Sequence, residues 1–286
     1  MIGTVDRWPD GKRAAAAFTF DVDAESAVLW SQPHNANRMS VMSHQAYGPL
    51  VGVPRILGLL ERHGVRGTFF VPGYTADRYP DVVRSIADAG HELAHHGYLH
   101  EQPTALTLEG EIEALDRGLE ALDRVAGVRP IGYRAPMWDL SWRTPELLHE
   151  RGFLYDSSLM DADSPYELAV GDGRSLVELP IQWALDDWEQ YCYLPDVSGS
   201  GLIERPAKAR ELWQSEFDGL RDAGGCWVLT NHPFLTGRPS RAHQLDGLME
   251  YVVSHADVWV APLGDIARYT RSLDLTPRTI DKPNLD

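Results

Sequence analysis

The stretch that decides the fold is His91-Glu92-Leu93-Ala94-His95-His96-Gly97-Tyr98-Leu99-His100-Glu101, which holds four of the eleven histidines of the chain. Residues 91–95 predict a short strand. His96 and His100 are four residues apart, so one helical turn, or a tight turn after a strand, would aim both imidazoles at one point. Two imidazoles and a carboxylate form a common open catalytic metal site. The alternative is a pair of solvated or structural histidines.

On both sides of this stretch, apolar runs typical of strands alternate with amphipathic helical runs, which indicates α/β architecture with a parallel sheet. The predicted strands are 14–20, 65–71, 91–95, 131–135, 153–156, 176–181, 226–230 and 258–260. The predicted helices are 49–62, 79–89, 107–125, 144–151, 206–223, 245–255 and 264–271, and residues 26–46 are expected to form a loop at the mouth of a site. Seven or eight such units predict a (β/α) barrel in a single domain, residues 1–286, with its core at about 14–270 and a loosely held tail at 277–286.

Composition excludes several classes of protein. The formal net charge of −16 argues against nucleic-acid binding, which needs a basic surface. No apolar run approaches the length of a membrane span, and the N-terminal residues lack the pattern of a secretion signal. Cys192 and Cys226 form neither a disulfide framework nor a zinc–thiolate pattern. These features together predict a cytoplasmic protein without a membrane partner.

The unusual polar side chains fall where the predicted strands end, and in a barrel these ends share one mouth. They are Asp21, Asp23, His96, His100, Arg134, Asp156 and His232. Asp21 and Asp23 would lie on the same face if the strand continued, and their charges would repel unless a cation intervened. One carboxylate could then bind a metal while the other takes a proton from water. An ordinary loop start is the alternative for this pair.

Two further motifs supply charge and protons. Arg134, if it is not simply part of a surface ion pair, could hold a catalytic carboxylate in its ionised form. Pro136 makes the next turn rigid, so the backbone N–H of Met137 could point into the site. His232 ends an apolar strand and precedes a proline, and a histidine placed in this way suits protonation of a leaving group.

Aromatic residues follow two of these strands. Trp138, and Trp183 in the segment Trp183–Trp188 that also contains Asp186 and Asp187, could wall a pocket around a flat ring or a sugar. Packing in the core or at an interface explains them equally well. The loop around residues 191–193 could serve a subunit contact, which predicts a homo-oligomer.

Four segments, taken in order, resemble the motifs of the polysaccharide deacetylase family, the NodB-homology domain. They are Thr19–Asp23, Gly90–Glu101, Tyr133–Pro136 and Leu229–Pro233, and the resemblance covers residues 14–261. It implies a distorted (β/α) barrel with one divalent metal ion. Zinc is the usual metal, and iron, manganese, cobalt and nickel are alternatives.

The resemblance also implies roles by motif position. Asp23, His96 and His100 would be the metal ligands. Asp21 would activate the metal-bound water, Arg134 would hold Asp21, and His232 would protonate the departing amine. The metal and the Met137 N–H would stabilise the tetrahedral oxyanion.

One departure from the family pattern narrows the resemblance. Val22 separates two aspartates that are usually adjacent, and this spaced form resembles a branch that holds a peptidoglycan-deacetylase-like protein, cyclic imide hydrolases and a metal-independent allantoinase. Both histidines of the pair are present here, which favours a metal. The fourth motif is not clear from the sequence, and Asp156-Ser157-Ser158 is its candidate.

These features predict a metal-dependent hydrolase that acts on a non-peptide carbon–nitrogen bond, by attack of metal-bound water on an amide or imide carbonyl. The substrate would be a small cyclic imide or ureide, which the absence of a secretion signal favours slightly, or an N-acetyl sugar. A catalytically inactive barrel that binds a carbohydrate or a partner is the alternative.

Overall fold

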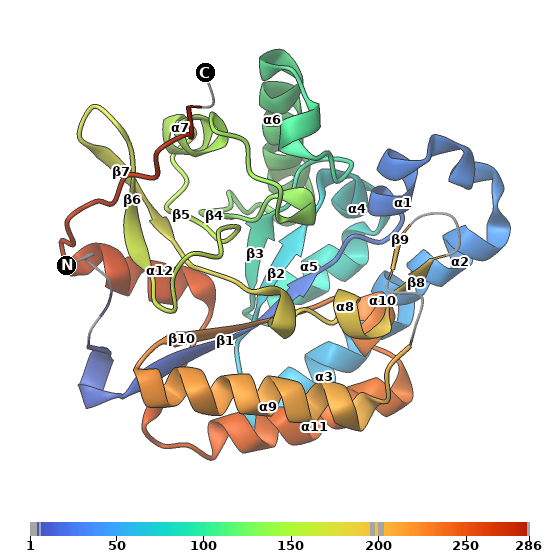
Figure 1. Cartoon of the computed structure of the whole chain (residues 1–286). Helices are drawn as coiled ribbons and strands as arrows, with labels where there is room; N and C mark the ends of the chain where they lie inside the picture. Colours follow the sequence, from blue (N-terminus) through green and yellow to red (C-terminus); the bar gives the residue numbers. More distant parts are fainter. Residues whose placement is uncertain (1–4, 6, 195–197, 200–202, 285–286) are drawn as a thin grey trace.

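The computed structural model describes Val5 and residues 7–194, 198–199 and 203–284. Its main sheet has nine strands in the order β10-β1-β2-β3-β4-β5-β7-β6, with β11 also paired to β1. Figure 1 shows β1, β2 and β3 near the centre of the molecule, β6 and β7 at its left edge, and long helices around the sheet. The prediction of a distorted (β/α) barrel is confirmed.

All eight predicted strands are present, and each runs parallel to its neighbours in the main sheet except where β7 meets β6. The strands are β1 Ala14–Asp21, β2 Thr68–Val71, β3 Glu92–His95, β4 Gly132–Tyr133, β5 Tyr155–Asp156, β6 Tyr166–Gly171, β7 Arg174–Glu178, β10 Cys226–Asn231 and β11 Val258–Val260, and a separate pair is formed by β8 Tyr193–Leu194 and β9 Ser198–Gly199. Strand β1 is buried along its whole length, as expected for the central strand of a parallel sheet.

The barrel is distorted where it closes. Within the described residues, no strand ladder joins β7 to β10. Instead the segment after β7 reaches β10 through a single bridge between Asp186 and Thr230, and the Asp187 N–H donates to the Thr230 carbonyl at 3.1 Å. This closure brings two acidic residues to the carboxyl end of β10, directly beside His232.

The helices cover the outside of the sheet, and α11 packs against both α3 and α9 (Figure 1). Their bounds are α1 Ser26–Ser31, α2 Met39–Tyr47, α3 Val53–His63, α4 Gly73–Arg78, α5 Pro80–Asp88, α6 Leu108–Ala126, α7 Thr144–Glu150, α8 Trp188–Tyr191, α9 Pro206–Ala223, α10 Pro233–Thr236, α11 Pro239–Val253 and α12 Leu263–Ser272. Helix α6 begins as predicted, because the Thr107 hydroxyl accepts from the Gly110 N–H at 3.1 Å. It ends before Gly127, which has a φ of 65°.

Several segments differ from the prediction, and the short helices α4, α8 and α10 are among the elements that were not predicted. Residues 26–46 are not a loop, because most of them form α1 and α2. Polar side chains are buried there, and the Asn35 amide donates to the Val28 carbonyl at 3.1 Å, so no apolar period marks these helices. Strand β6 was not predicted, and it pairs antiparallel with β7. Helix α11 begins six residues earlier than predicted, at Pro239.

The remaining expectations concern the tail of the chain, its relation to a membrane, its location and its assembly. The backbone of Arg278 pairs with β6, while residues 285–286 of the predicted tail, and residues 1–4 and 6, lie outside the described part. Among the described helices, none combines the length and hydropathy that a membrane crossing needs. The domain bounds, the cytoplasmic location and the homo-oligomer stay predictions.

Candidate functional site

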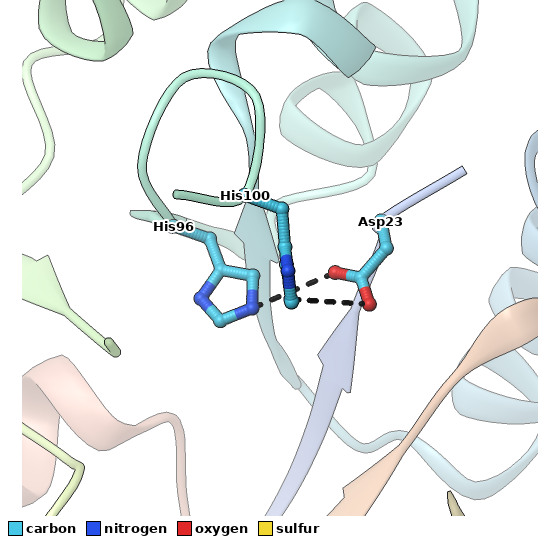
Figure 2. A group of neighbouring side chains, drawn as sticks. All are labelled: Asp23, His96 and His100. Carbon is cyan, nitrogen blue, oxygen red and sulfur yellow. Dashed lines mark ion pairs between the residues drawn. The ribbon is translucent and has the colours of Figure 1, made fainter. Parts of the chain in front are cut away.

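Asp23, His96 and His100 meet at the mouth of the barrel (Figure 2). One oxygen of Asp23 lies 3.5 Å from His96 Nε2, and the other lies 3.6 Å from His100 Nε2. All three side chains are buried. The structure therefore brings together the three residues that the sequence marked as metal ligands.

The histidine pair is placed by a tight turn that follows β3, and not by a helix. Gly97 has a φ of 72°, a conformation that glycine adopts without strain. The Glu101 carboxylate accepts from the backbone N–H groups of Tyr98 at 2.9 Å and Leu99 at 2.8 Å, which closes the turn. His100 has a φ of 65°, an uncommon value for a non-glycine residue, and its ring lies 4.9 Å from that of His96. Glu101 was not recognised from the sequence as part of the site.

The protonation of His96 follows from its partners. Its Nδ1 lies 2.7 Å from the Arg134 carbonyl oxygen, which can only accept, so Nδ1 carries the proton and Nε2 has a free lone pair. Burial lowers the pKa of His96 to about 3, although Asp23 raises it in part. The ring is therefore neutral at physiological pH, with Nε2 turned toward Asp23 as a metal ligand requires.

The surroundings of Asp23 fit a cation. Both carboxylate oxygens are buried, and no hydrogen-bond donor reaches either of them within the part of the chain that the structure describes. A buried carboxylate without donors is costly, and a bound cation removes that cost. Two imidazoles and one carboxylate form a donor set that suits a divalent metal such as zinc.

Asp21 lies beside this group and is held by Arg134. The guanidinium donates to Asp21 Oδ1 at 2.8 Å and to the Thr19 hydroxyl at 3.0 Å, and its face stacks on Phe70. Arg134 is completely buried, so it is not part of a surface ion pair. The second oxygen of Asp21 lies 3.9 Å from His96 Nε2 and faces the predicted metal site.

His232 also lies at this group, with its Nε2 3.7 Å from Asp23. Its Nδ1 lies 2.7 Å from Asp187 Oδ1, and the same oxygen accepts from the His232 backbone N–H at 2.9 Å. Burial disfavours the charged ring, but Asp186 and Asp187 outweigh it and raise the pKa of His232 to about 10. Burial, with help from Asp187, raises the pKa of Asp186 to about 7. The sequence named both aspartates but did not connect them with His232.

Aromatic side chains wall the site. A cavity of about 90 Å³ lies between the polar residues and Met137, Trp138 and Trp183. The rings of Trp138 and Trp183 stack 4.3 Å apart, and Trp183 is 44% exposed at the rim. Met137 and Trp138 have φ values of 58° and 54°, and such strained backbone is often found at functional sites. The structure thus places all three residues at the cavity.

A larger cavity, of about 380 Å³, adjoins the first and shares His100, Met137 and Trp188 with it. Its outer wall is formed by helix α1, including Trp30. The unpredicted helix α1 therefore extends the site outward from the cluster of polar residues.

Three residues that the sequence singled out lie elsewhere. Asp156 is buried behind Arg134 and does not line either cavity at the mouth. His95 Nε2 lies 3.0 Å from the Leu115 carbonyl, and its Nδ1 accepts from the Gly97 N–H. His91 Nδ1 accepts from the Gly67 N–H at 3.2 Å. Both histidines thus bond to the backbone, as the sequence reading allowed.

Known proteins are similar to this chain in sequence and fold. The sequence profile of the polysaccharide deacetylases matches residues 37–155. The chain is 31% identical to a peptidoglycan deacetylase of Helicobacter pylori over 275 residues, which cover 87% of this chain and 94% of the relative. The chain belongs to the polysaccharide deacetylase family. Members of this family hydrolyse carbon–nitrogen bonds in polysaccharides or related substrates.

Solved structures of polysaccharide deacetylase relatives agree over nearly the full length. A protein of Mycobacterium smegmatis that is assigned as a polysaccharide deacetylase is 62% identical, with a TM-score of 0.97 and coverage of 100% of this chain and 99% of the other. The Puue allantoinase is 27% identical, with a TM-score of 0.82 and coverage of 93% of each chain. The predicted resemblance to this branch of the family is confirmed.

Proposed function

We propose that the protein is a metal-dependent hydrolase that cleaves a non-peptide carbon–nitrogen bond at the mouth of its barrel. The observation that carries this proposal is the buried Asp23 carboxylate, which has the rings of two histidines beside it and, among the described residues, no hydrogen-bond donor. A second carboxylate, that of Asp21, and a third histidine, His232, lie next to this group. This arrangement provides a metal site, a proton acceptor and a proton donor within one small cavity.

Asp23, His96 and His100 would hold one divalent ion, with zinc as the first candidate and iron, manganese, cobalt or nickel compatible with the same donors. When bound, the ion would polarise the substrate carbonyl and lower the pKa of water. Both Asp23 oxygens lack a donor among the described residues, so they are free to bind the ion. In His96 the Nδ1 is bonded to the Arg134 carbonyl, which leaves Nε2 to bind the ion.

Asp21 is the proposed general base. Arg134 occupies its Oδ1, so Oδ2 is left to take a proton from the attacking water. Thr19 shares the same guanidinium nitrogen, which fixes the direction of the ion pair. In this role Arg134 orients the base and does not itself exchange a proton.

His232 is the proposed general acid. Its Nδ1–H is bonded to Asp187, so Nε2 is the nitrogen that faces the cavity and can donate to the departing nitrogen. Asp187 also accepts from the hydroxyl of Thr236, which fixes the carboxylate. The Met137 N–H is the proposed donor to the carbonyl oxygen as negative charge develops there.

The cavities favour an N-acetyl sugar over a small cyclic imide or ureide. The inner space suits a reacting acyl group, and the larger space beside it has room for the rest of a bulky substrate. Trp138 and Trp183 offer aromatic faces of the kind on which sugars stack. The peptidoglycan deacetylase relative supports the same choice, whereas the Puue allantoinase supports the ureide.

A hydrolysis panel tests the proposal. The zinc-loaded protein and a chelator-treated sample are given chitin oligomers, peptidoglycan fragments, succinimide, hydantoin and allantoin, and released acetate or opened ring is measured. We expect acetate from the sugars and none after chelation. Turnover that chelation leaves untouched would contradict metal dependence, and no turnover on any substrate would support an inactive binding barrel.

A further inference from the structure

A buried turn behind Arg134 controls the position of two parts of the proposed active site. The turn is Asp156-Ser157-Ser158, which follows β5. Ser157 accepts from the Arg134 guanidinium through its carbonyl at 3.1 Å and its hydroxyl at 3.2 Å. The Ser158 hydroxyl accepts from the Ala135 N–H at 2.8 Å. The turn therefore fixes the side chain of Arg134 and the backbone that leads to Met137.

Two carboxyl groups hold this turn in place. Asp156 on β5 pairs in register with Glu178 on β7, and both side chains are fully buried. Asp156 Oδ1 accepts from the Ser158 hydroxyl at 2.7 Å. Glu178 Oε1 accepts from the backbone N–H groups of Ser158 at 3.1 Å and Leu159 at 2.9 Å. One oxygen of each carboxyl is thus fully used by the turn.

The remaining oxygens, Asp156 Oδ2 and Glu178 Oε2, have no donor within the described part of the chain, and the strand register places the two side chains next to each other on one face of the sheet. Two ionised carboxylates in contact inside a protein repel strongly, and a single proton between them turns the repulsion into a hydrogen bond. Burial raises the pKa of Asp156 to about 6, and burial together with the charge of Asp156 raises the pKa of Glu178 well above its usual value. Glu178 is therefore the group that keeps the proton.

We propose that Asp156 and Glu178 share one proton, and that this carboxyl pair is the positioning device that aligns Arg134 and Ala135 for the reaction. The second half of this inference rests on the proposed function, since it is Asp21 that Arg134 orients. Neither carboxyl lines the catalytic cavity, so both act through other residues. The pair also gives Asp156 a role, which the sequence left open.

Amide substitutions test the shared proton, because an amide can replace either partner but not both. In Glu178→Gln, the amide oxygen still accepts from the turn and the amide N–H donates to Asp156. In Asp156→Asn, the new N–H donates to an ionised Glu178. In the double variant, two NH2 groups face each other without an acceptor. We expect kcat within about threefold of wild type for each single variant and about 30-fold lower for the double, a strongly non-additive result.

The controls separate positioning from general damage. Glu178→Ala should lower kcat about tenfold or more with KM little changed, while Glu178→Gln rescues it. Glu146 and Asp172 provide a matched pair, since both are exposed and both contact Arg174. Their two amide substitutions should be additive and nearly neutral.

Glu178→Gln, Asp156→Asn, their double variant and Glu178→Ala are also compared by urea unfolding, a measurement that needs no substrate. Non-additive loss of stability in the double variant supports the shared proton. This conclusion holds even if the wild-type protein hydrolyses no substrate of the panel, because that result would refute only the proposed function. Additive losses in both measurements, or a Glu178→Gln variant as impaired as Glu178→Ala, would overturn the proposal. Non-additive stability with an unchanged kcat in the double variant would overturn its positioning role.

Discussion

Arg134→Met is the substitution that most sharply tests how the proposed base is held. Arg134 is completely buried and Asp21 is 2% exposed, and their ion pair is 2.8 Å long. Methionine is unbranched and uncharged and reaches about as far as the Nε of arginine, so it keeps the packing of the arginine stem and leaves the Asp21 carboxylate buried without its cation. The Ser157 carbonyl loses a donor as well.

The magnitude follows from the burial. Removing one partner of a buried ion pair costs about 3–5 kcal/mol, and we expect the free energy of unfolding to fall by about 4 kcal/mol. Asp21→Asn removes the stranded charge, so the double variant should recover about 2 kcal/mol of that loss. Activity should fall at least about 100-fold, because the proton acceptor is no longer held in position.

The assay is urea unfolding monitored by tryptophan fluorescence, and metal content is measured on the same samples. Arg117→Met is the matched control: Arg117 is 49% exposed and pairs with the exposed Glu113, so its loss should cost less than about 1 kcal/mol. A loss below about 1 kcal/mol for Arg134→Met, or no recovery in the double variant, would refute the argument that the buried ion pair of Arg134 and Asp21 stabilises the site.

Three further predictions concern the acid, the pocket wall and the carboxyl pair. Asp187→Asn should lower kcat about 100-fold with metal content unchanged, because His232 loses the acceptor at Nδ1; steady-state kinetics that show no change would remove Asp187 from the mechanism. Trp183→Ala should raise KM for chitin oligomers about tenfold and leave kcat within about twofold, and an unchanged KM would mean that the rim does not bind substrate. The unfolding free energy of wild type relative to Glu178→Gln should fall as the pH rises above 4.5, the usual pKa of a glutamate, because folded Glu178 keeps the proton that the unfolded chain releases; a rise or a flat difference in urea titrations would contradict the raised pKa of Glu178.

The fold could largely be predicted because its parallel strands are continuous apolar runs, such as Ala14–Asp21. The prediction failed where polar side chains are buried. Glu167 on β6 is buried and its charge is met by Arg271 at 2.8 Å, which hides the strand in the sequence. In the same way, the buried side chains of Asn35 and Gln45 break the apolar period of the region around α1 and α2.

The site was predictable where its residues end a strand, as Asp21, His96 and His232 do. It was not predictable where tertiary closure supplies the partner. Asp187 reaches His232 only because the segment after β7 crosses to β10, and no local signal in the sequence encodes that crossing. Asp156 ends a strand too, but its side chain points to Glu178, so position alone did not reveal its role.

The central claim is that Asp23 binds the metal while Asp21 moves the proton. It is tested most directly by zinc content, measured by mass spectrometry after loading and desalting of wild type, Asp21→Asn and Asp23→Ala. We predict that wild type and Asp21→Asn retain one equivalent of zinc, that Asp23→Ala retains none, and that only wild type turns over substrate. Equal loss of zinc in both variants, or full retention in Asp23→Ala, would contradict this assignment.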